Sequence, residues 1–399
     1  MIAARLPAIF GIAGFPALWV SLSLAGLAAS ISQIALSWTT LELTASPLGV
    51  ALTLAVRMVP SLLLGIPLGA VSDRVDRRRL IRSANLVAGG VGLLVAGLAF
   101  GGLLGVPAIV AFSFVFGIID TARTTATQAY VYDLVGADRA TNGLAMSNLG
   151  AQLFGSAGAI LGGVLIAAGG LGSGFGVATV CWLVAAIVFG RTRATGSVAV
   201  DRLTPSARSA LTLLGRNREV RWILVMVIVT EVLGFSSMTL TPTFARDVLD
   251  VGAAGLGVLV AGRSIGAVIG LLRLTRVGAA TRTGRLLLSL GVAFGLLLVV
   301  FALSGLFPVS LVVMFVIGAV AAGVDTLAQT LLQHATDDHQ RGASMGVWVF
   351  GVGFGPIGFI GLGAAAAAFG APSAQAVAGA LLVAMSLVVA VAGPIRRLR

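Results

Sequence analysis

The stretch LAVRMVPSLLLGIPLGAVSDRVDRRR, residues 54–79, is a long apolar run with one internal arginine, followed by a loop crowded with aspartate and arginine. About 20 apolar residues let a helix cross a bilayer, which only helices or closed barrels can span. Unbroken apolar runs and short charged loops alternate along all 399 residues, of which 58% are hydrophobic and only 10% are charged. Because soluble domains carry about 25% charged residues, the sequence predicts an all-α integral membrane protein.

Twelve apolar runs are separated by charges or turn residues, and the longest polar stretch lies midway. The expected transmembrane helices lie near 15–39, 47–71, 81–103, 106–132, 140–168, 172–190, 220–245, 252–275, 284–305, 307–333, 342–369 and 372–394. We therefore expect an N-terminal six-helix bundle at 1–190, a cytoplasmic linker at 191–218 and a C-terminal six-helix bundle at 219–399.

The arginines predict the orientation, because cytoplasmic loops of membrane proteins are enriched in basic residues. With twelve crossings, Arg246 is the one arginine in a loop on the opposite side, and three lie inside spans; all others fall on one side. Every basic residue is arginine, which is typical of a GC-rich bacterial genome. We expect a multi-pass protein of the bacterial inner (plasma) membrane with both termini in the cytoplasm.

Several kinds of site are not expected. The net charge of +12 is scattered between apolar runs, which argues against a nucleic-acid partner. Cys181 stands alone, and His334 and His339 fall in a short loop that is typical of a solvated turn. No catalytic set is found inside the spans, and without lysine no P-loop can form. The sequence predicts no metal site, no cofactor and no enzymatic activity, so a gradient must drive any transport.

Sparse polar residues recur at matching places in the two halves, as in "GIIDT" at 117–121 and "GVDT" at 323–326. The matched pairs are Arg57 with Arg263, Asp120 with Asp325, and Gln128 with Gln333. Two pseudo-symmetric six-helix bundles with a substrate site near mid-membrane are the architecture expected from such a repeat.

The loop "GAVSDRVDRRR" at 69–79 resembles the signature of the major facilitator superfamily between spans two and three. The matching positions are Gly69, Asp73, Arg74, Arg77, Arg78 and Arg79, whereas Asp76 replaces the usual glycine. The macrolide and siderophore exporter branch, which comprises transmembrane effectors and drug efflux proteins, is further resembled by "LAVRMVPSLLLG" at 54–65, "QAYVYDLVGADRATNGLAMSN" at 128–148 and "LLQHATDDHQRGASMG" at 331–346. The resemblance covers essentially the whole chain and implies that superfamily's fold.

The resemblance also implies gating roles between the halves. Asp73 is expected to sit against a helix N-terminus of the other half, where the helix dipole favours negative charge, and the loop arginines are expected to form a charge relay. The glycine-rich "GSAGAILGG" at 155–163, with Gly158 and Gly162, resembles the signature of proton-coupled drug exporters, although Ala159 replaces its proline. Ordinary helix packing and a gating hinge both remain open for this segment and for the Gly355–Pro356 step.

Charged residues inside spans are costly and should face protein or water. By resemblance, spans one, four, seven and ten line the central cavity, which places Asp120, Arg123, Glu231 and Asp325 along the substrate path. Arg57 and Arg263 are expected on helices at the interface between halves.

A carboxylate in a low-dielectric cavity can take up a proton near neutral pH, so the three acids are candidates for proton coupling. Glu231 is the first choice because no basic residue lies within a helical turn of it, whereas Asp120 can pair with Arg123 at i,i+3. A structural ion pair is the alternative for Asp120 and Arg123, and a water-facing position at the membrane end is the alternative for Glu231.

Gln128, Gln333, Trp38 and Phe235 complete the expected substrate cavity. The tryptophans Trp19, Trp38, Trp182, Trp222 and Trp348 mostly lie near predicted span ends, as interfacial anchors do, so of these only Trp38 enters the expected cavity.

The leading interpretation is a monomeric, proton-coupled antiporter that exports small amphipathic organic molecules, in the manner of multidrug or macrolide efflux. The alternatives are a siderophore or lysophospholipid transporter and, from another class, a non-transporting membrane receptor or assembly protein on the same scaffold. Membrane lipids are the remaining expected partners.

Overall fold

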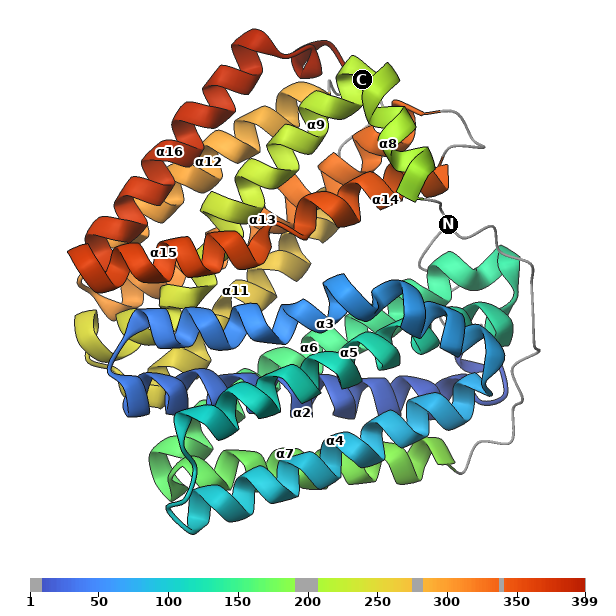
Figure 1. Ribbon diagram of the computed structural model, residues 1–399, viewed down its shortest axis with the longest axis vertical. Helices are drawn as coiled ribbons and strands as arrows, with labels where there is room; N and C mark the ends of the chain where they lie inside the picture. Colours follow the sequence, from blue (N-terminus) through green and yellow to red (C-terminus); the bar gives the residue numbers. More distant parts are fainter. Residues whose placement is uncertain (1–8, 191–206, 275–282, 337–340, 399) are drawn as a thin grey trace. The chain divides into compact units, whose positions relative to one another are not determined.

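Residues 9–190, 207–274, 283–336 and 341–398 are described in the computed structural model. Within these residues the regular elements are all helices, and twelve helices are long and apolar enough to cross a membrane. The predicted all-α membrane fold with twelve transmembrane helices is therefore confirmed. Figure 1 shows the helices in chain order from blue to red.

The helices before the central polar stretch are α2 (Phe15–Thr44), α3 (Pro47–Arg74), α4 (Arg77–Phe100), α5 (Val106–Val135), α6 (Ala137–Gly169) and α7 (Leu171–Gly190). Of the expected linker, residues 191–206 lie outside the described part of the chain, and Ala207–Arg216 forms the short helix α8.

The seventh span, Arg218–Val248, is built from several helical types. It begins as α9 (Arg218–Val229) and continues through a π-helical turn, η1 (Thr230–Gly234), and a 3-10 segment, η2 (Phe235–Leu240). It ends with α10 (Thr241–Thr243) and a second π turn, η3 (Phe244–Val248). The remaining helices are α11 (Gly252–Leu274), α12 (Thr283–Leu303), α13 (Phe307–His334), α14 (Arg341–Val352), α15 (Gly355–Phe369) and α16 (Ala371–Ala392).

The chain forms two compact units. The first comprises Met1–Ala45, Val56–Val200 and Val251–Ala261, and the second comprises Ser46–Ala55, Asp201–Asp250 and Gly262–Arg399. The first turns of α3 thus belong to the second unit and the rest of that helix to the first. For α11 the division is the reverse. The bundle limits at 190 and 219 remain a prediction.

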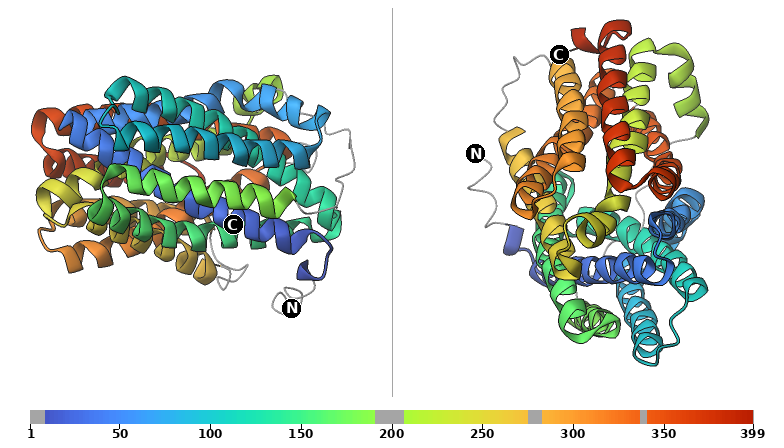
Figure 2. Two further views of the ribbon diagram at one scale, coloured as in Figure 1. Left: turned by 90° about the horizontal axis from the view of Figure 1, so that it is seen from below. Right: turned by 90° about the vertical axis from the view of Figure 1, so that its left-hand side faces the viewer.

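In the first unit, long helices lie side by side (Figure 2), and small residues let them approach closely. A Cβ atom added to Gly26 would lie 2.6 Å from the carbonyl oxygen of Ala151, and one added to Gly158 would lie 2.4 Å from that of Leu27. Gly162 similarly faces Ile31. Such small residues let helices pack without side chains between them. Gly158 and Gly162 therefore pack α6 against α2 within one unit.

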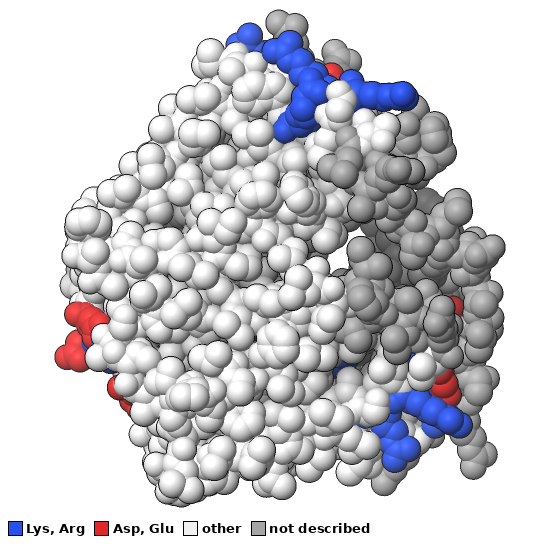
Figure 3. Space-filling view, viewed as in Figure 1, with Lys and Arg blue, Asp and Glu red and all other residues white. Residues whose placement is uncertain are grey.

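The second unit uses the same device between α12 and α16. Added Cβ atoms at Gly295 and Gly379 would each fall within 2.7 Å of the carbonyl oxygen of the other glycine. At one end of the unit, buried side chains of α9, α12 and α13, including Ile223, Leu287 and Leu332, form its apolar core. Uncharged side chains cover most of the face in Figure 3, and charged ones gather at the ends of helices, as a lipid-facing surface requires.

Candidate functional site

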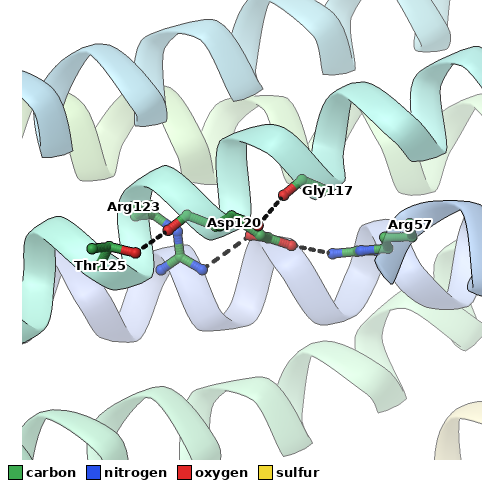
Figure 4. A network of polar contacts seen from close by, with 6 residues as sticks. Arg57, Gly117, Asp120, Arg123 and Thr125 are labelled. Atoms are coloured by element: carbon green, nitrogen blue, oxygen red, sulfur yellow. Dashed lines mark hydrogen bonds and ion pairs between the residues drawn. The ribbon is translucent and has the colours of Figure 1, made fainter. Parts of the chain in front are cut away.

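A polar network in the first unit joins α3 to α5 (Figure 4). Nη2 of Arg57 donates to Oδ2 of Asp120 at 2.6 Å, and Nη2 of Arg123 donates to Oδ1 of the same carboxylate at 3.1 Å. The Asp120 side chain is 28% exposed, whereas those of Arg57 and Arg123 are 15% and 14% exposed. One carboxylate thus holds two buried guanidinium groups, and the i,i+3 pairing allowed by the sequence is present.

A glycine positions this network. A Cβ atom added to Gly117 would lie 2.2 Å from the carbonyl oxygen of Arg57, so no other residue allows α3 and α5 to cross this closely at that point. Asp120 follows Gly117 by three residues, about 4.5 Å along the helix and on the same face. The crossing therefore brings the Arg57 side chain to the Asp120 carboxylate.

Trp182 on α7 forms one wall of the network. The guanidinium of Arg123 lies over its ring, 5.3 Å from the ring centroid, within the range of a cation–π contact. Trp182 is buried, so its ring contacts protein groups and not the membrane surface. Among the described residues, no partner accepts a hydrogen bond from Nη1 of Arg57, Nε of Arg123 or Nε1 of Trp182.

Glu231 lies in the π turn η1, at the point where the seventh span stops being α-helical. It is 9% exposed and lies well inside the span, so the water-facing alternative was wrong. π turns are rare and occur frequently at functional sites. Gly358 of α15 packs directly on the neighbouring Val232, since an added Cβ atom would come within 2.6 Å of its backbone. The turn that carries Glu231 is therefore held by close backbone contact.

One charged group of α11 and one of α13 lie within electrostatic reach of Glu231. Both Arg263 and Asp325 are close enough to interact electrostatically with its carboxylate. Arg263 also lies over the ring of Phe235, 6.0 Å from its centroid, and that ring meets Phe294 edge to face. In the described part of the chain, no hydrogen bond or ion pair to the Glu231 carboxylate is found.

Asp325 has partners of its own. Nε2 of Gln329 donates to Oδ2 at 3.0 Å, and Nε1 of Trp348 donates to Oδ1 at 3.1 Å. Trp348 therefore contacts an acidic side chain of a neighbouring helix. Gln329 was not expected at this site, and its one signal in the sequence is its place one helical turn after Asp325.

The two halves differ where α11 crosses α13. Here Gly318 faces the backbone of Arg263, as Gly117 faces that of Arg57. Asp325, however, follows Gly318 by seven residues, about 10 Å along the helix. The acid thus lies one turn further from the crossing than in the first half. This shift explains why Arg263 interacts with Glu231 and Phe235, and why no ion pair to Asp325 is found among the described residues.

The signature loop is anchored by a buried ion pair. Nη1 of Arg77 donates to Oδ2 of Asp133 on α5, and the two side chains are only 8% and 3% exposed. Nη2 of Arg78 donates to the carbonyl oxygen of Gly190 at the end of α7. Sequence analysis missed Asp133, although it lies in a stretch that resembles the exporter branch.

Asp76, which departs from the signature glycine, caps α4. Its Oδ1 accepts hydrogen bonds from the backbone N–H groups of Arg78 and Arg79 at 2.9 and 3.4 Å. Aspartate and glycine are both favoured at this helix position, which explains the substitution. Gly69, Asp73 and Arg74 belong to the last turns of α3, and their side chains lie outside the described residues.

The other expected cavity residues lie apart from both clusters. Gln128 and Gln333 are exposed near helix ends, and Nε2 of Gln333 donates to Sδ of Met345 at 3.4 Å. Trp38 is buried in α2 and donates to Oε1 of Glu42 at 2.7 Å. The Gly355–Pro356 step begins α15, directly after the break that ends α14. In the described ranges no three potential ligand side chains are grouped as a metal site would require.

Comparisons with known proteins agree on a transporter fold. A family model described as transmembrane secretion effector matches residues 7–397. The staphyloferrin A transporter of Staphylococcus aureus is 23% identical over 352 residues, or 85% of this chain and 86% of that protein. The enterobactin exporter EntS of Shigella flexneri is 26% identical over 287 residues, or 70% of this chain and 67% of that protein.

Solved structures are similar over nearly the whole chain. An inward-facing, unoccupied bacterial homologue of the human lysosomal transporter Spinster has a TM-score of 0.69 at 14% identity, covering 96% of this chain and 95% of that one. The nucleoside transporter NupG has a TM-score of 0.72 at 12% identity, covering 95% and 98%. At these identities the similarity establishes the fold alone.

Proposed function

Because the chain belongs to the transmembrane secretion effector family of the major facilitator superfamily, we propose that it exports small amphipathic organic molecules by proton-coupled antiport. It is a multi-pass membrane protein, and its bacterial relatives imply the inner membrane. Transport would proceed by alternating access, with the cargo bound between two pseudo-symmetric halves.

The observation that carries the proposal is the environment of Glu231. Its carboxylate is buried in a π turn beside Arg263, and no hydrogen bond holds it among the described residues. Arg263 brings a positive charge and Asp325 a negative one within electrostatic reach of this carboxylate, so protonation of Glu231 changes the net charge of the cluster by one unit. Proton binding therefore changes the electrostatics at the irregular part of the seventh span, which is the coupling an antiporter needs.

The other two acids are less suited to this role. Asp120 is held by two arginines, which stabilise its charged form. Asp325 accepts hydrogen bonds from Gln329 and Trp348. We propose Glu231 as the main proton-binding group, and Asp120 and Asp325 as groups that orient the cargo path.

Transport in proteoliposomes tests the proposal. We expect a radiolabelled macrolide to move against its gradient when a pH gradient is imposed, and to equilibrate without one. Glu231→Gln should lose the response to the pH gradient and keep exchange of labelled for unlabelled cargo, whereas Asp120→Asn should keep the response. Loss of the response in Asp120→Asn alone would assign proton coupling to the first unit and refute the role of Glu231.

A siderophore is the second candidate cargo, and the curated relatives favour it. Both the staphyloferrin A transporter and the enterobactin exporter are named for siderophores. A parallel series with radiolabelled enterobactin separates the two candidates, and a lysophospholipid series covers the remaining alternative. A receptor or assembly protein on this scaffold would move none of these compounds.

Orientation and gating complete the proposal. We propose that Asp73 and Arg74 act with Gly69 in a latch between the halves. We also propose that both termini lie in the cytoplasm, which the placement of the arginines supports. Single cysteines at Arg79 and Asp247, introduced into a Cys181→Ser background, test the orientation. A membrane-impermeant thiol reagent applied to intact cells should label only the second position.

A further inference from the structure

The network of Arg57, Asp120 and Arg123 carries an unbalanced charge. Two guanidinium groups share a single carboxylate, so the network has one positive charge in excess inside a predicted span. A charge in such surroundings is costly unless an opposite charge accompanies it. A bound anion would supply that charge.

The network also has donors to spare. Each arginine uses one Nη atom on Asp120, while a guanidinium presents five N–H donors. Nη1 of Arg57 and Nε of Arg123 have no acceptor among the described residues, and neither does Nε1 of the adjoining Trp182. Unsatisfied buried donors of this kind are rare in folded proteins and call for an explanation. An oxyanion that takes the place of Asp120 can accept from both guanidinium groups.

The carboxylate is the accessible side of the network. The Asp120 side chain is about twice as exposed as those of the two arginines it holds. An anion that approaches from this side would contact the same Nη2 atoms of Arg57 and Arg123 that Asp120 contacts. The Trp182 ring lies against the Arg123 guanidinium and holds the plane of that group in place when an anion replaces Asp120 as its acceptor.

From this arrangement we infer that Arg57 and Arg123 form a binding subsite for an oxyanion group of the cargo, a carboxylate or a phosphate, and that Asp120 competes with that group for the two arginines. The inference rests on the proposed function, because a cargo subsite has a purpose only in a transporter. Among the candidate cargoes it favours amphipathic molecules with an anionic group, such as a siderophore, over a macrolide, whose ionisable group is a basic amine. Asp120 then speeds release, since it replaces the departing anion.

Binding of small aromatic probes to the purified protein in lipid nanodiscs tests this subsite without any gradient. The probes are radiolabelled benzoate, its neutral isostere benzamide, and phenyl phosphate. We expect the two anions to bind and benzamide not to bind, and the tighter anion identifies the group that the subsite prefers. Benzoate should also change the fluorescence of Trp182, and this change should disappear in Trp182→Phe.

The variants separate competition from a purely structural ion pair. Arg57→Gln and Arg123→Gln should each weaken benzoate binding about tenfold, or about 1.4 kcal/mol. Asp120→Asn should tighten it by a similar factor, because its competing charge is gone. Asp247→Asn removes the same charge from an exposed pair with Arg246 and should change nothing.

Equal binding of benzamide and benzoate would overturn the inference, and so would weaker or unchanged benzoate binding in Asp120→Asn. Monodisperse elution of each variant in size-exclusion chromatography serves as the folding control. If an arginine variant fails this control, the results with Asp120→Asn and with benzamide still show whether an anion competes with Asp120 for the arginines. Normal probe binding together with absent transport would instead refute the proposed function.

Discussion

Gly117→Ala should loosen the crossing that assembles the first polar network. The new Cβ atom would lie 2.2 Å from the carbonyl oxygen of Arg57 and 2.9 Å from Cγ of Pro60. Because the nearest atom belongs to the backbone, side-chain rotation cannot relieve the overlap. The two helices must separate, which moves Arg57 away from Asp120.

The expected magnitude follows from two opposing effects. Extra volume in a packed interior costs about 1–3 kcal/mol, while replacing glycine by alanine inside a helix gains about 0.8–1.0 kcal/mol. Gly97→Ala is a matched control, because an added Cβ atom there has no neighbour within 4 Å and only the gain remains. The two variants should therefore differ in stability by about 1–3 kcal/mol, with Gly117→Ala the less stable.

The assay is the apparent melting temperature of the purified protein in one detergent at one heating rate, since membrane proteins commonly unfold irreversibly and their melting temperatures depend on the rate. Gly97→Ala should melt at or slightly above the temperature of the parent protein, and Gly117→Ala below it. Equal melting temperatures for the two variants would refute the close crossing of α3 and α5.

Three further outcomes are expected. Asp133→Asn removes the charge with which the buried Arg77 pairs and should cost about 3–5 kcal/mol, so it should lower the melting temperature strongly; a normal melting curve would contradict the buried ion pair. Asp76→Ala should cost about 1 kcal/mol through loss of the α4 cap, and Asp76→Asn almost nothing; equal losses in both would exclude capping as the cause. Asp73→Asn should abolish transport while the protein stays in the membrane in normal amount, and normal export by this variant would remove the latch.

The span positions could be predicted because they depend on the hydrophobicity of continuous stretches of the chain. A run of about 20 apolar residues in lipid has few alternatives to a helix, so the twelve spans follow from composition and the interrupting charges. The i,i+3 pair of Asp120 and Arg123 also follows from the sequence, because both residues share one helix and its geometry fixes their separation.

Contacts between helices could not be predicted in the same way. The repeat aligns Arg57 with Arg263 and Asp120 with Asp325, which suggests identical pairing in both halves. The pairing depends on which glycine lies at the helix crossing, and that glycine differs by about one turn between the halves. Alignment of polar residues alone carries no information about this shift.

Buried partners were missed for a related reason. Trp182 and Trp348 were assigned from their position along a span, whereas their role depends on which side of the helix they occupy. Asp133 is one acid among several near helix ends, and only the tertiary structure brings Arg77 to it.

The π turn at Thr230–Gly234 has a consequence for sequence change in this span. Such a turn holds one residue more than an α turn, because its hydrogen bonds run from i to i+5. Deleting one residue there would remove the extra residue of the turn and would rotate all that follows by about 100° relative to α9. The spacing between Glu231 and Phe235 is therefore as important as their identity, and insertions or deletions in these five positions should be far less tolerated than substitutions.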